Sequence, residues 1–325
     1  MFRRKAEIPA ECRDTQKEQE EVDKSTPQLA KVLTGQHAGI TGLDFHPTKY
    51  QIVSSSTDGT LGLWSIKPNT RAFRMVGHRD AALCVRFSAE GHILASGSRD
   101  KTIRMWIPSS RAESMAIQAH TAAVSSIDFS LDTTIFCSGS HDKSIKIWDG
   151  QQFKFLQSFT GHNHWVRSVR FSPDSKTVVS AGHDNTIKLW SVKEKSILYS
   201  IESFGGTVNH AQFHPSGNYI AAAIDDGSIK VWDVRKSFQL VQLYRVHDGP
   251  VNQLDFHPSG SLLISVSDDK TIKIMDAANG ELIYTLYGHE RPVRQIQFAP
   301  TGLFFATAGA DDRILLWKNG SRPTC

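Results

Sequence analysis

The sequence is poor in cysteine and has no long apolar run. Only four of its 325 residues are cysteines, namely Cys12, Cys84, Cys137 and Cys325, and no two of them form a Cys-x-x-Cys pair. A disulfide-stabilised domain or a zinc module needs clustered cysteines, so we expect reduced thiols. No apolar run approaches the roughly 18 residues that cross a membrane, and we therefore expect no membrane partner.

The sequence also lacks the short motifs that mark common enzymes. There is no Gly-x-Ser-x-Gly, no phosphate-binding loop and no His-Glu-x-x-His, so we expect no enzyme and no cofactor or metal site. The net charge is only +4, from 37 Lys and Arg against 33 Asp and Glu, and no run of five basic residues occurs. This charge pattern disfavours nucleic acid as a partner and is compatible with an acidic protein surface.

A repeat of about 42 residues dominates the sequence. Seven positions at this spacing carry Trp or, once, Met, and five of the six intervals are 42 residues long: Trp64, Trp106, Trp148, Trp190, Trp232, Met275 and Trp317. An Asp stands six residues before each of them: Asp58, Asp100, Asp142, Asp184, Asp226, Asp269 and Asp311. A period of this length indicates one supersecondary unit used seven times.

Each repeat contains four short segments with strand character. In the fourth repeat they are residues 165–171, 177–181, 186–190 and 192–201, and Ser-Pro-Asp-Ser at 172–175 forms the first turn. Four antiparallel strands per repeat are typical of one blade of a β-propeller. The sequence therefore predicts an all-β protein whose single domain, residues 28–318, is a seven-bladed β-propeller.

Polar residues recur at fixed places in the repeat. A His usually opens it, and a Ser or Thr stands four residues before the Asp. We expect the Asp to accept from the His, the His to contact the hydroxyl group, and that group to meet the Trp N–H, because buried polar groups need partners. In repeats two to four the network is His78, Ser96, Asp100, Trp106, His120, Ser138, Asp142, Trp148, His162, Ser180, Asp184 and Trp190. The first repeat is expected to open with His37.

Two repeats depart from this pattern. Repeat five has Phe204 and Ala222 in place of the His and the Ser, so two polar members disappear together. We expect Asp226 to turn to backbone N–H groups there. Repeat six has Met275 in place of the Trp, and Met fills space without needing a hydrogen-bond partner.

The last repeat lacks a fourth strand, and residues 28–34 offer one. We expect them to pair with residues 313–317 and close the ring, because an unpaired edge strand invites aggregation. Residues 1–27 are charged and poor in strand formers, which predicts a flexible N-terminal tail. Residues 319–325 are expected to form a short C-terminal tail.

Candidate binding residues gather on one face of the predicted ring. They flank the start of each first strand or stand just before the turn Asp: Arg99, His141, Trp165, Arg167, His183 and Arg294. Trp and Arg are enriched at interface hot spots, so we interpret this set as a docking patch for an acidic protein surface. The alternative is that Trp165 only packs between blades. If His141 and His183 titrate normally, binding should strengthen below about pH 6.5.

The repeats resemble WD40 repeats over residues 28–318. Several segments are also similar to the "proteome of centriole 1" family of centriolar WD40 proteins: RAFRMVGHRDA at 71–81, WVRSVRFSPD at 165–174, IAAA at 220–223 and KIMDAANGELIYTLYGH at 273–289. The resemblance implies a cytoskeletal scaffold of the cytoplasm, at the centriole, the centrosome and the cilium basal body. It also implies that the propeller binds tubulin or other proteins of the microtubule wall and supports centriole stability and ciliogenesis.

Two points stay open from the sequence. That family usually continues into a C-terminal coiled coil, and no such segment follows residue 318 here, so self-association is undecided. The alternative function is that of a WD40 adaptor in another complex, such as a ubiquitin-ligase substrate receptor or a subunit of ribonucleoprotein assembly.

Overall fold

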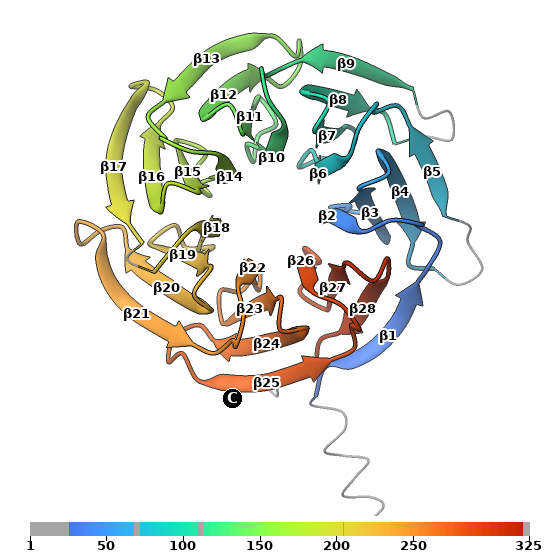
Figure 1. Ribbon diagram of the computed structural model, residues 1–325, viewed down its shortest axis with the longest axis vertical. Coiled ribbons are helices and arrows are strands. Elements are labelled where there is room, and N and C mark those ends of the chain that lie inside the picture. Colours follow the sequence, from blue (N-terminus) through green and yellow to red (C-terminus); the bar gives the residue numbers. More distant parts are fainter. Residues whose placement is uncertain (1–25, 68–71, 109–112, 204, 321–325) are drawn as a thin grey trace, which may run out of the picture.

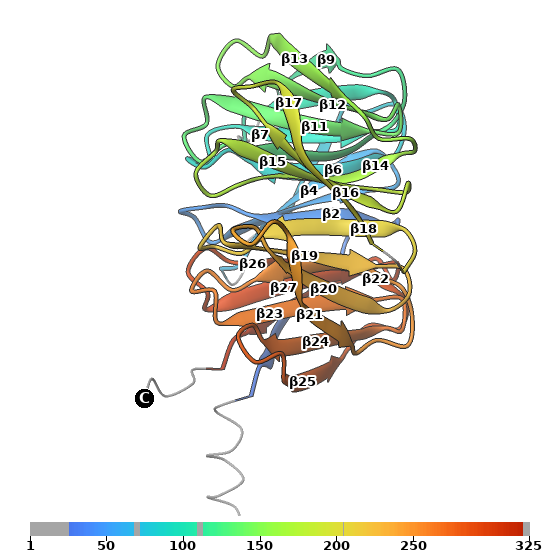
Figure 2. The same cartoon turned by 90° about the vertical axis from the view of Figure 1, so that its left-hand side faces the viewer.

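The computed structural model describes residues 26–67, 72–108, 113–203 and 205–320. Within these residues the chain forms seven four-stranded antiparallel sheets, set in a ring like the blades of a propeller (Figure 1). Residues of all seven blades line a cavity at the centre of the ring, and we call this space the channel. Seen from the side in Figure 2, the ring is a disc, with β17 (Ser196–Glu202) and β21 (Gln239–Arg245) on its near rim. The predicted all-β, seven-bladed fold is confirmed.

Each blade runs outward from the channel. The innermost strands are β2 Ile40–Phe45, β6 Ala82–Phe87, β10 Val124–Phe129, β14 Val166–Phe171, β18 Val208–Phe213, β22 Val251–Phe256 and β26 Val293–Phe298. The second strands are β3 Gln51–Ser56, β7 Leu94–Ser98, β11 Ile135–Ser140, β15 Thr177–Gly182, β19 Tyr219–Ile224, β23 Leu262–Ser267 and β27 Phe304–Gly309. The third are β4 Thr60–Ser65, β8 Thr102–Trp106, β12 Ser144–Asp149, β16 Thr186–Ser191, β20 Ser228–Asp233, β24 Thr271–Asp276 and β28 Ile314–Lys318. The outermost, besides β17 and β21, are β1 Gln28–Leu33, β5 Phe73–Val76, β9 Ser114–Gln118, β13 Phe155–Thr160 and β25 Leu282–Tyr287.

The two ends of the propeller meet in one blade. Strand β1 pairs antiparallel with β28, with Leu33 opposite Ile314 and Val32 opposite Leu315, and completes the sheet β1-β28-β27-β26. The predicted closure by the N-terminal strand is therefore confirmed (Figure 1). Residues 1–25 and 321–325 lie outside the described residues, and so does most of each predicted tail.

The core lies between the blades, where the face of one sheet packs on the next. Leu33, Ile40, Ile314 and Leu316 share one cluster that joins the last blade to the first. Such clusters bury apolar surface at about 25 cal/mol per Å², which favours a ring that leaves no sheet face open.

The predicted polar chain is present in the blades that carry a His. In the second blade His78 Nδ1 lies 3.0 Å from Asp100 Oδ2, and His78 Nε2 lies 2.7 Å from Ser96 Oγ. Trp106 Nε1 donates to the same hydroxyl oxygen at 2.8 Å. A carboxylate only accepts, so the network places the imidazole proton on Nδ1 and leaves Nε2 to accept from Ser96.

The same three contacts recur in three further blades. They join the sets His120–Asp142–Ser138–Trp148, His162–Asp184–Ser180–Trp190 and His289–Asp311–Thr307–Trp317, at distances from 2.7 to 3.0 Å. In the sixth blade His247 Nε2 lies 2.8 Å from Ser265 Oγ, but Met275 offers no N–H and is fully buried. The Ser265 hydroxyl group therefore has one side-chain partner in this network, whereas the corresponding hydroxyl group of the four complete blades has two.

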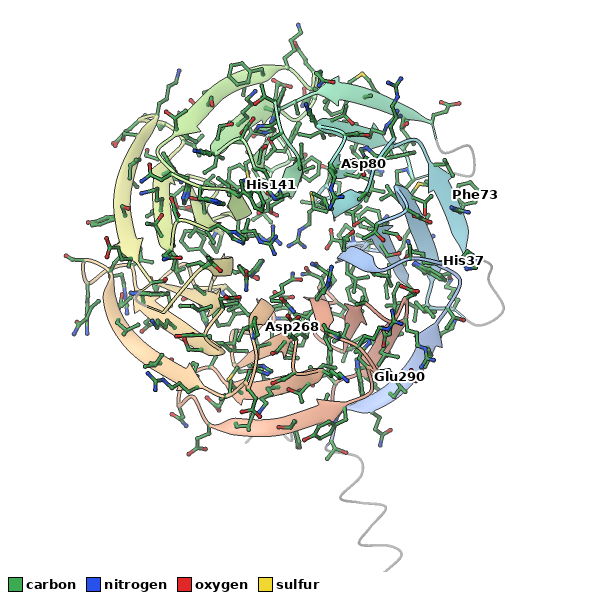
Figure 3. The ribbon with its side chains drawn as sticks, viewed as in Figure 1. His37, Phe73, Asp80, His141, Asp268 and Glu290 are labelled. Atoms are coloured by element: carbon green, nitrogen blue, oxygen red, sulfur yellow. The ribbon has the colours of Figure 1, made fainter. Side chains whose placement is uncertain are left out.

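The first blade differs from its prediction. His37 is exposed (Figure 3), and Gln36 takes the place of the His, because it stands 22 residues before Asp58 as His78 does before Asp100. Ser54 Oγ donates to Gln36 Oε1 at 2.7 Å, and Asp58 pairs with Arg74 at 3.2 Å. The assignment of His37 was wrong by one position.

The fifth blade can be described only in part. Phe204 lies outside the described residues, and Ala222 is fully buried. Asp226 accepts from the backbone N–H of Ser228 at 2.9 Å and from the Ser228 hydroxyl group.

Loss of the Ser hydroxyl group should lower the free energy of unfolding more in a blade with a complete His–Ser–Asp–Trp network than in the sixth blade, which has Met275 in place of the Trp. Ser138→Ala leaves both His120 and Trp148 without a partner, whereas Ser265→Ala orphans His247 alone. At about 1–3 kcal/mol for each orphaned group, we expect losses in the free energy of unfolding of about 2–6 kcal/mol for Ser138→Ala and about 1–3 kcal/mol for Ser265→Ala. Urea unfolding of both variants measures the difference, and equal losses would contradict the network.

Candidate functional site

At one end of the ring the channel opens, and its cavity has a volume of about 630 Å³. Five of the six residues predicted for the docking patch line it: Arg99, His141, Trp165, Arg167 and Arg294. We call this set the channel mouth. Figure 3 shows His141 and Asp268 on opposite sides of the opening, and Asp268 also lines the cavity. The sixth predicted residue, His183, lies beside the mouth and contacts Trp165.

A local irregularity in every innermost strand supplies the residues of the cavity wall. The pairing with the second strand shifts register around the second residue, for example between Val166 and Ser168, so that Arg167 has no cross-strand partner. The shift recurs in all seven inner strands of the described chain. Such bulges re-aim a side chain, and all seven unpaired residues line the cavity: Thr41, Leu83, Ser125, Arg167, Asn209, Asn252 and Arg294. We call this set the bulge ring.

Trp165 sits within a cluster of imidazole rings. It stacks on His141 of the third blade, with ring centroids 4.4 Å apart and an interplanar angle of 10°. His183 lies 5.5 Å and His164 5.1 Å from it. Trp165 thus bridges two blades, as its packing interpretation requires, yet 42% of it is exposed, as a docking residue requires.

Two histidines of this cluster, His141 and His183, have lowered pKa values. Burial, and then the charges of Arg167, His183 and Arg99, lower the pKa of His141 to about 4. Burial and Arg167 also lower the pKa of His183. The expected gain of charge near pH 6.5 is therefore wrong for His141, whose imidazole is neutral there. The positive charge of the mouth comes from its three arginines.

The sequence interpretation missed a second ring deeper in the channel, made of five charged residues and two glutamines. They occupy one position in each inner strand, directly before its final Phe: Asp44, Arg86, Asp128, Arg170, Gln212, Asp255 and Gln297. Arg86 donates to Asp44 at 3.1 Å and to Gln297 at 2.6 Å. Burial raises the pKa of Asp255 to about 6. Alignment of the repeats on that Phe reveals the ring and the alternation of charge over its first four members.

His210 lies between these two rings and lines the same cavity. It is 5% exposed, and neither of its ring nitrogens has a hydrogen-bond partner. Burial, followed by the charges of Arg170 and Arg86, lowers its pKa well below the usual value. The imidazole is therefore neutral in the folded protein at ordinary pH.

The comparisons with protein families account for this architecture. The model for the WD domain, G-beta repeat, matches residues 27–65, 69–106, 112–149 and 153–191, and each match spans the outermost strand of one blade and the three inner strands of the next. This chain is built from WD40 repeats. A second model, the Nucleolar protein 10-like N-terminal domain, matches residues 201–315 of the WD40 propeller. WD40 propellers mediate protein–protein interactions, and neither matching model describes an enzyme.

Short stretches of the WD40 propeller are similar to curated proteins. Mouse pre-mRNA-processing factor 19 is 36% identical over 73 residues, which cover 22% of this chain and 14% of that protein. Rat POC1 centriolar protein homolog B is 46% identical over 50 residues, or 15% and 10% of the two chains. The ribosome biogenesis protein WDR12 homolog of Nematostella vectensis is 27% identical over 66 residues, or 20% and 16%. The chain thus matches only a small part of the length of each relative.

None of the described elements is a helix long and apolar enough to cross a membrane. Nor do three His, Cys, Asp or Glu side chains come together there in a group that suits a metal ion. Cys84 and Cys137 are free thiols, and burial raises the pKa of Cys84 to about 12. Cys12 and Cys325 lie outside the described residues.

The stability of the folded protein should decrease as the pH is lowered, and His210 should account for part of this decrease. Its pKa is lower in the folded than in the unfolded state, so below the unfolded value of about 6.5 only the unfolded chain takes up the proton. We expect this residue to remove about 1.4 kcal/mol of unfolding free energy between pH 7.5 and pH 5.5. His210→Gln should lose less stability over this range than the wild type. Urea unfolding at both pH values in phosphate-free buffers measures the difference, and parallel losses would contradict the assignment.

Proposed function

We propose that this WD40 propeller is a non-enzymatic scaffold that docks an acidic protein surface on its channel mouth. We further propose that the acidic surface is tubulin or another protein of the microtubule wall in centrioles and basal bodies. The protein would then support centriole assembly or stability and ciliogenesis, in the cytoplasm and at the centrosome.

The observation that supports docking most is the setting of Trp165. An exposed Trp that is held by stacking on His141 loses little freedom when it binds, and such side chains are typical of hot spots. Arg99, Arg167 and Arg294 line the same mouth and are exposed. Asp268 lies on the opposite side of the opening (Figure 3), and it would orient the partner by repelling its acidic part.

The microtubule wall is favoured by the likeness to centriolar proteins. The segment that resembles rat POC1 centriolar protein homolog B is short, but its identity of 46% is higher than that of the other two relatives described above. The repeat-six segment KIMDAANGELIYTLYGH adds a departure from the common repeat that the centriolar family shares. An acidic tubulin surface also suits a mouth with three arginines.

The second candidate is an adaptor in ribonucleoprotein assembly. It is favoured by the match of residues 201–315 to the Nucleolar protein 10-like model and by the likeness to pre-mRNA-processing factor 19. No comparable observation favours a ubiquitin-ligase substrate receptor. Tagged protein in dividing cells separates the two candidates: we expect paired centrosomal spots, whereas nucleolar or nuclear staining without them would favour the second.

Removal of the mouth side chains should weaken binding to microtubules. We expect Trp165→Ala to bind at least tenfold more weakly, since truncated hot-spot residues cost about 2 kcal/mol or more. Arg167→Glu should do the same, because it places a charge of the wrong sign against an acidic surface. Co-sedimentation with stabilised microtubules measures both, and binding should also fall as salt rises.

Two variants on the outer surface serve as matched controls. Lys154→Glu reverses an exposed charge, and Tyr287→Ala removes an exposed aromatic ring, both away from the mouth. We expect wild-type binding from each. If folded Trp165→Ala and Arg167→Glu also bind normally, Trp165 serves only to pack the blades and the docking proposal fails. If the wild type does not pellet even at low salt, direct microtubule binding fails.

A further inference from the structure

Unpartnered polar atoms are concentrated around the channel. In the described part of the chain, eight buried side-chain nitrogen or oxygen atoms lack a hydrogen-bond partner. Five of them belong to residues that line the 630 Å³ cavity: His141 Nε2, Ser168 Oγ, Arg170 Nε, and Nδ1 and Nε2 of His210. Buried polar groups without partners are costly and uncommon. The presence of five such atoms around one cavity therefore indicates that the cavity binds a ligand.

These groups are mainly donors. Ser168 and His210 follow the bulge ring in their strands, and they are only 2% and 5% exposed. The Ser168 hydroxyl and a neutral His210 each have one proton to donate, and Arg170 Nε has a further one. Arg170 Nη1 donates to the carbonyl oxygen of Val169 at 2.9 Å. Among the described residues no carboxylate is hydrogen-bonded to the Arg170 guanidinium group.

The bulge ring above these groups also contains hydrogen-bond donors without an acceptor in the residues that the structure describes. Its smaller polar members are satisfied by the backbone of the next blade: Thr41 and Ser125 donate to the carbonyl oxygens of Ala82 and Val166, and Asn209 and Asn252 to those of Val251 and Val293. The guanidinium groups of Arg167 and Arg294 make no such bond among the described residues. They stand in the fourth and seventh blades, and burial, followed by the charge of Arg294, lowers the pKa of Arg167.

We propose that the channel binds a phosphate-type oxyanion, held between Arg167 and Arg294 with Ser168 and His210 beneath it. Guanidinium forks and hydroxyl donors suit a tetrahedral anion with several acceptor oxygens. A cation would meet Arg167, Arg170 and Arg294 at once. The carboxylates nearby are already engaged: Asp268 accepts from Asn252 at 2.7 Å, and Asp44 and Asp255 accept from backbone N–H groups, both at 2.7 Å.

The oxyanion has two sources, free inorganic phosphate or a phosphoryl group on a side chain of a partner. This site shares Arg167 and Arg294 with the channel mouth, but Ser168 and His210 lie below the mouth, and the site does not depend on which protein the mouth binds. Isothermal titration calorimetry with inorganic phosphate tests the first source. Titration with a Gly-phosphoserine-Gly peptide capped at both ends tests the second, with the unphosphorylated and Gly-Glu-Gly peptides as controls.

Ser168→Ala distinguishes ligand binding from a structural role. The hydroxyl group has no partner in the free protein, so its removal should leave the thermal midpoint unchanged or raise it. Its loss should nevertheless weaken oxyanion binding about tenfold, as expected when a hydrogen bond to a charged group is removed. Arg167→Gln should weaken binding at least as much, while Lys154→Gln, on the outer surface, should leave it unchanged.

Each outcome decides the proposal. Binding of either phosphate probe that Ser168→Ala and Arg167→Gln both weaken supports it, and the probe that binds identifies the source. Absence of binding by both probes overturns it, because the five atoms then hydrogen-bond only to water. Binding that both variants leave unchanged also overturns it. Because Ser168 is buried below the mouth, Ser168→Ala should still pellet with microtubules, so this proposal and the docking proposal fail separately.

Discussion

The pairing of β1 with β28 is the contact on which the rest of the structure depends. A four-stranded sheet cannot bury both of its faces alone, and the seven sheets do so only when the last packs on the first. Residues from both ends of the described chain meet in that seam, where Leu33 and Ile40 join Ile314 and Leu316 in one cluster. Closure also brings Arg294 of the last blade to the same cavity as Arg167 of the fourth. The candidate site is therefore a product of the closed ring.

Within the ring, the polar residues divide into two classes. The His, Ser, Asp and Trp of the repeat partner one another within their blades and hold the second and third strands together. The residues of the channel come instead from the innermost strands, where a register shift frees one side chain per blade. Because the shift fixes the direction but not the identity of that side chain, the channel wall varies from Leu83 to Arg167 while the fold stays the same.

The regular part of this protein could be predicted from its sequence, since the period, the closing strand and the hydrogen-bond partners follow from repetition. All six candidate residues were expected on one face, and five of them line one cavity. The predictions that failed depend on the exact position of a residue or on its environment in the folded protein. Gln36 rather than His37 serves the first blade, and the pKa of His141 is set by burial and by arginines from other blades. His210 and the ring that contains Arg86 and Asp255 were missed because single repeats do not reveal which side chains converge on the channel.

Hydrogen–deuterium exchange of the whole chain, with and without stabilised microtubules, tests the central claim most directly. If the mouth is the docking surface, exchange should slow at the starts of β14 and β26 and in the turns that carry Arg99 and His141. The outer strands β5, β17 and β21 should exchange at the same rate with and without microtubules. Protection of those outer strands, with none at the mouth, would contradict the account.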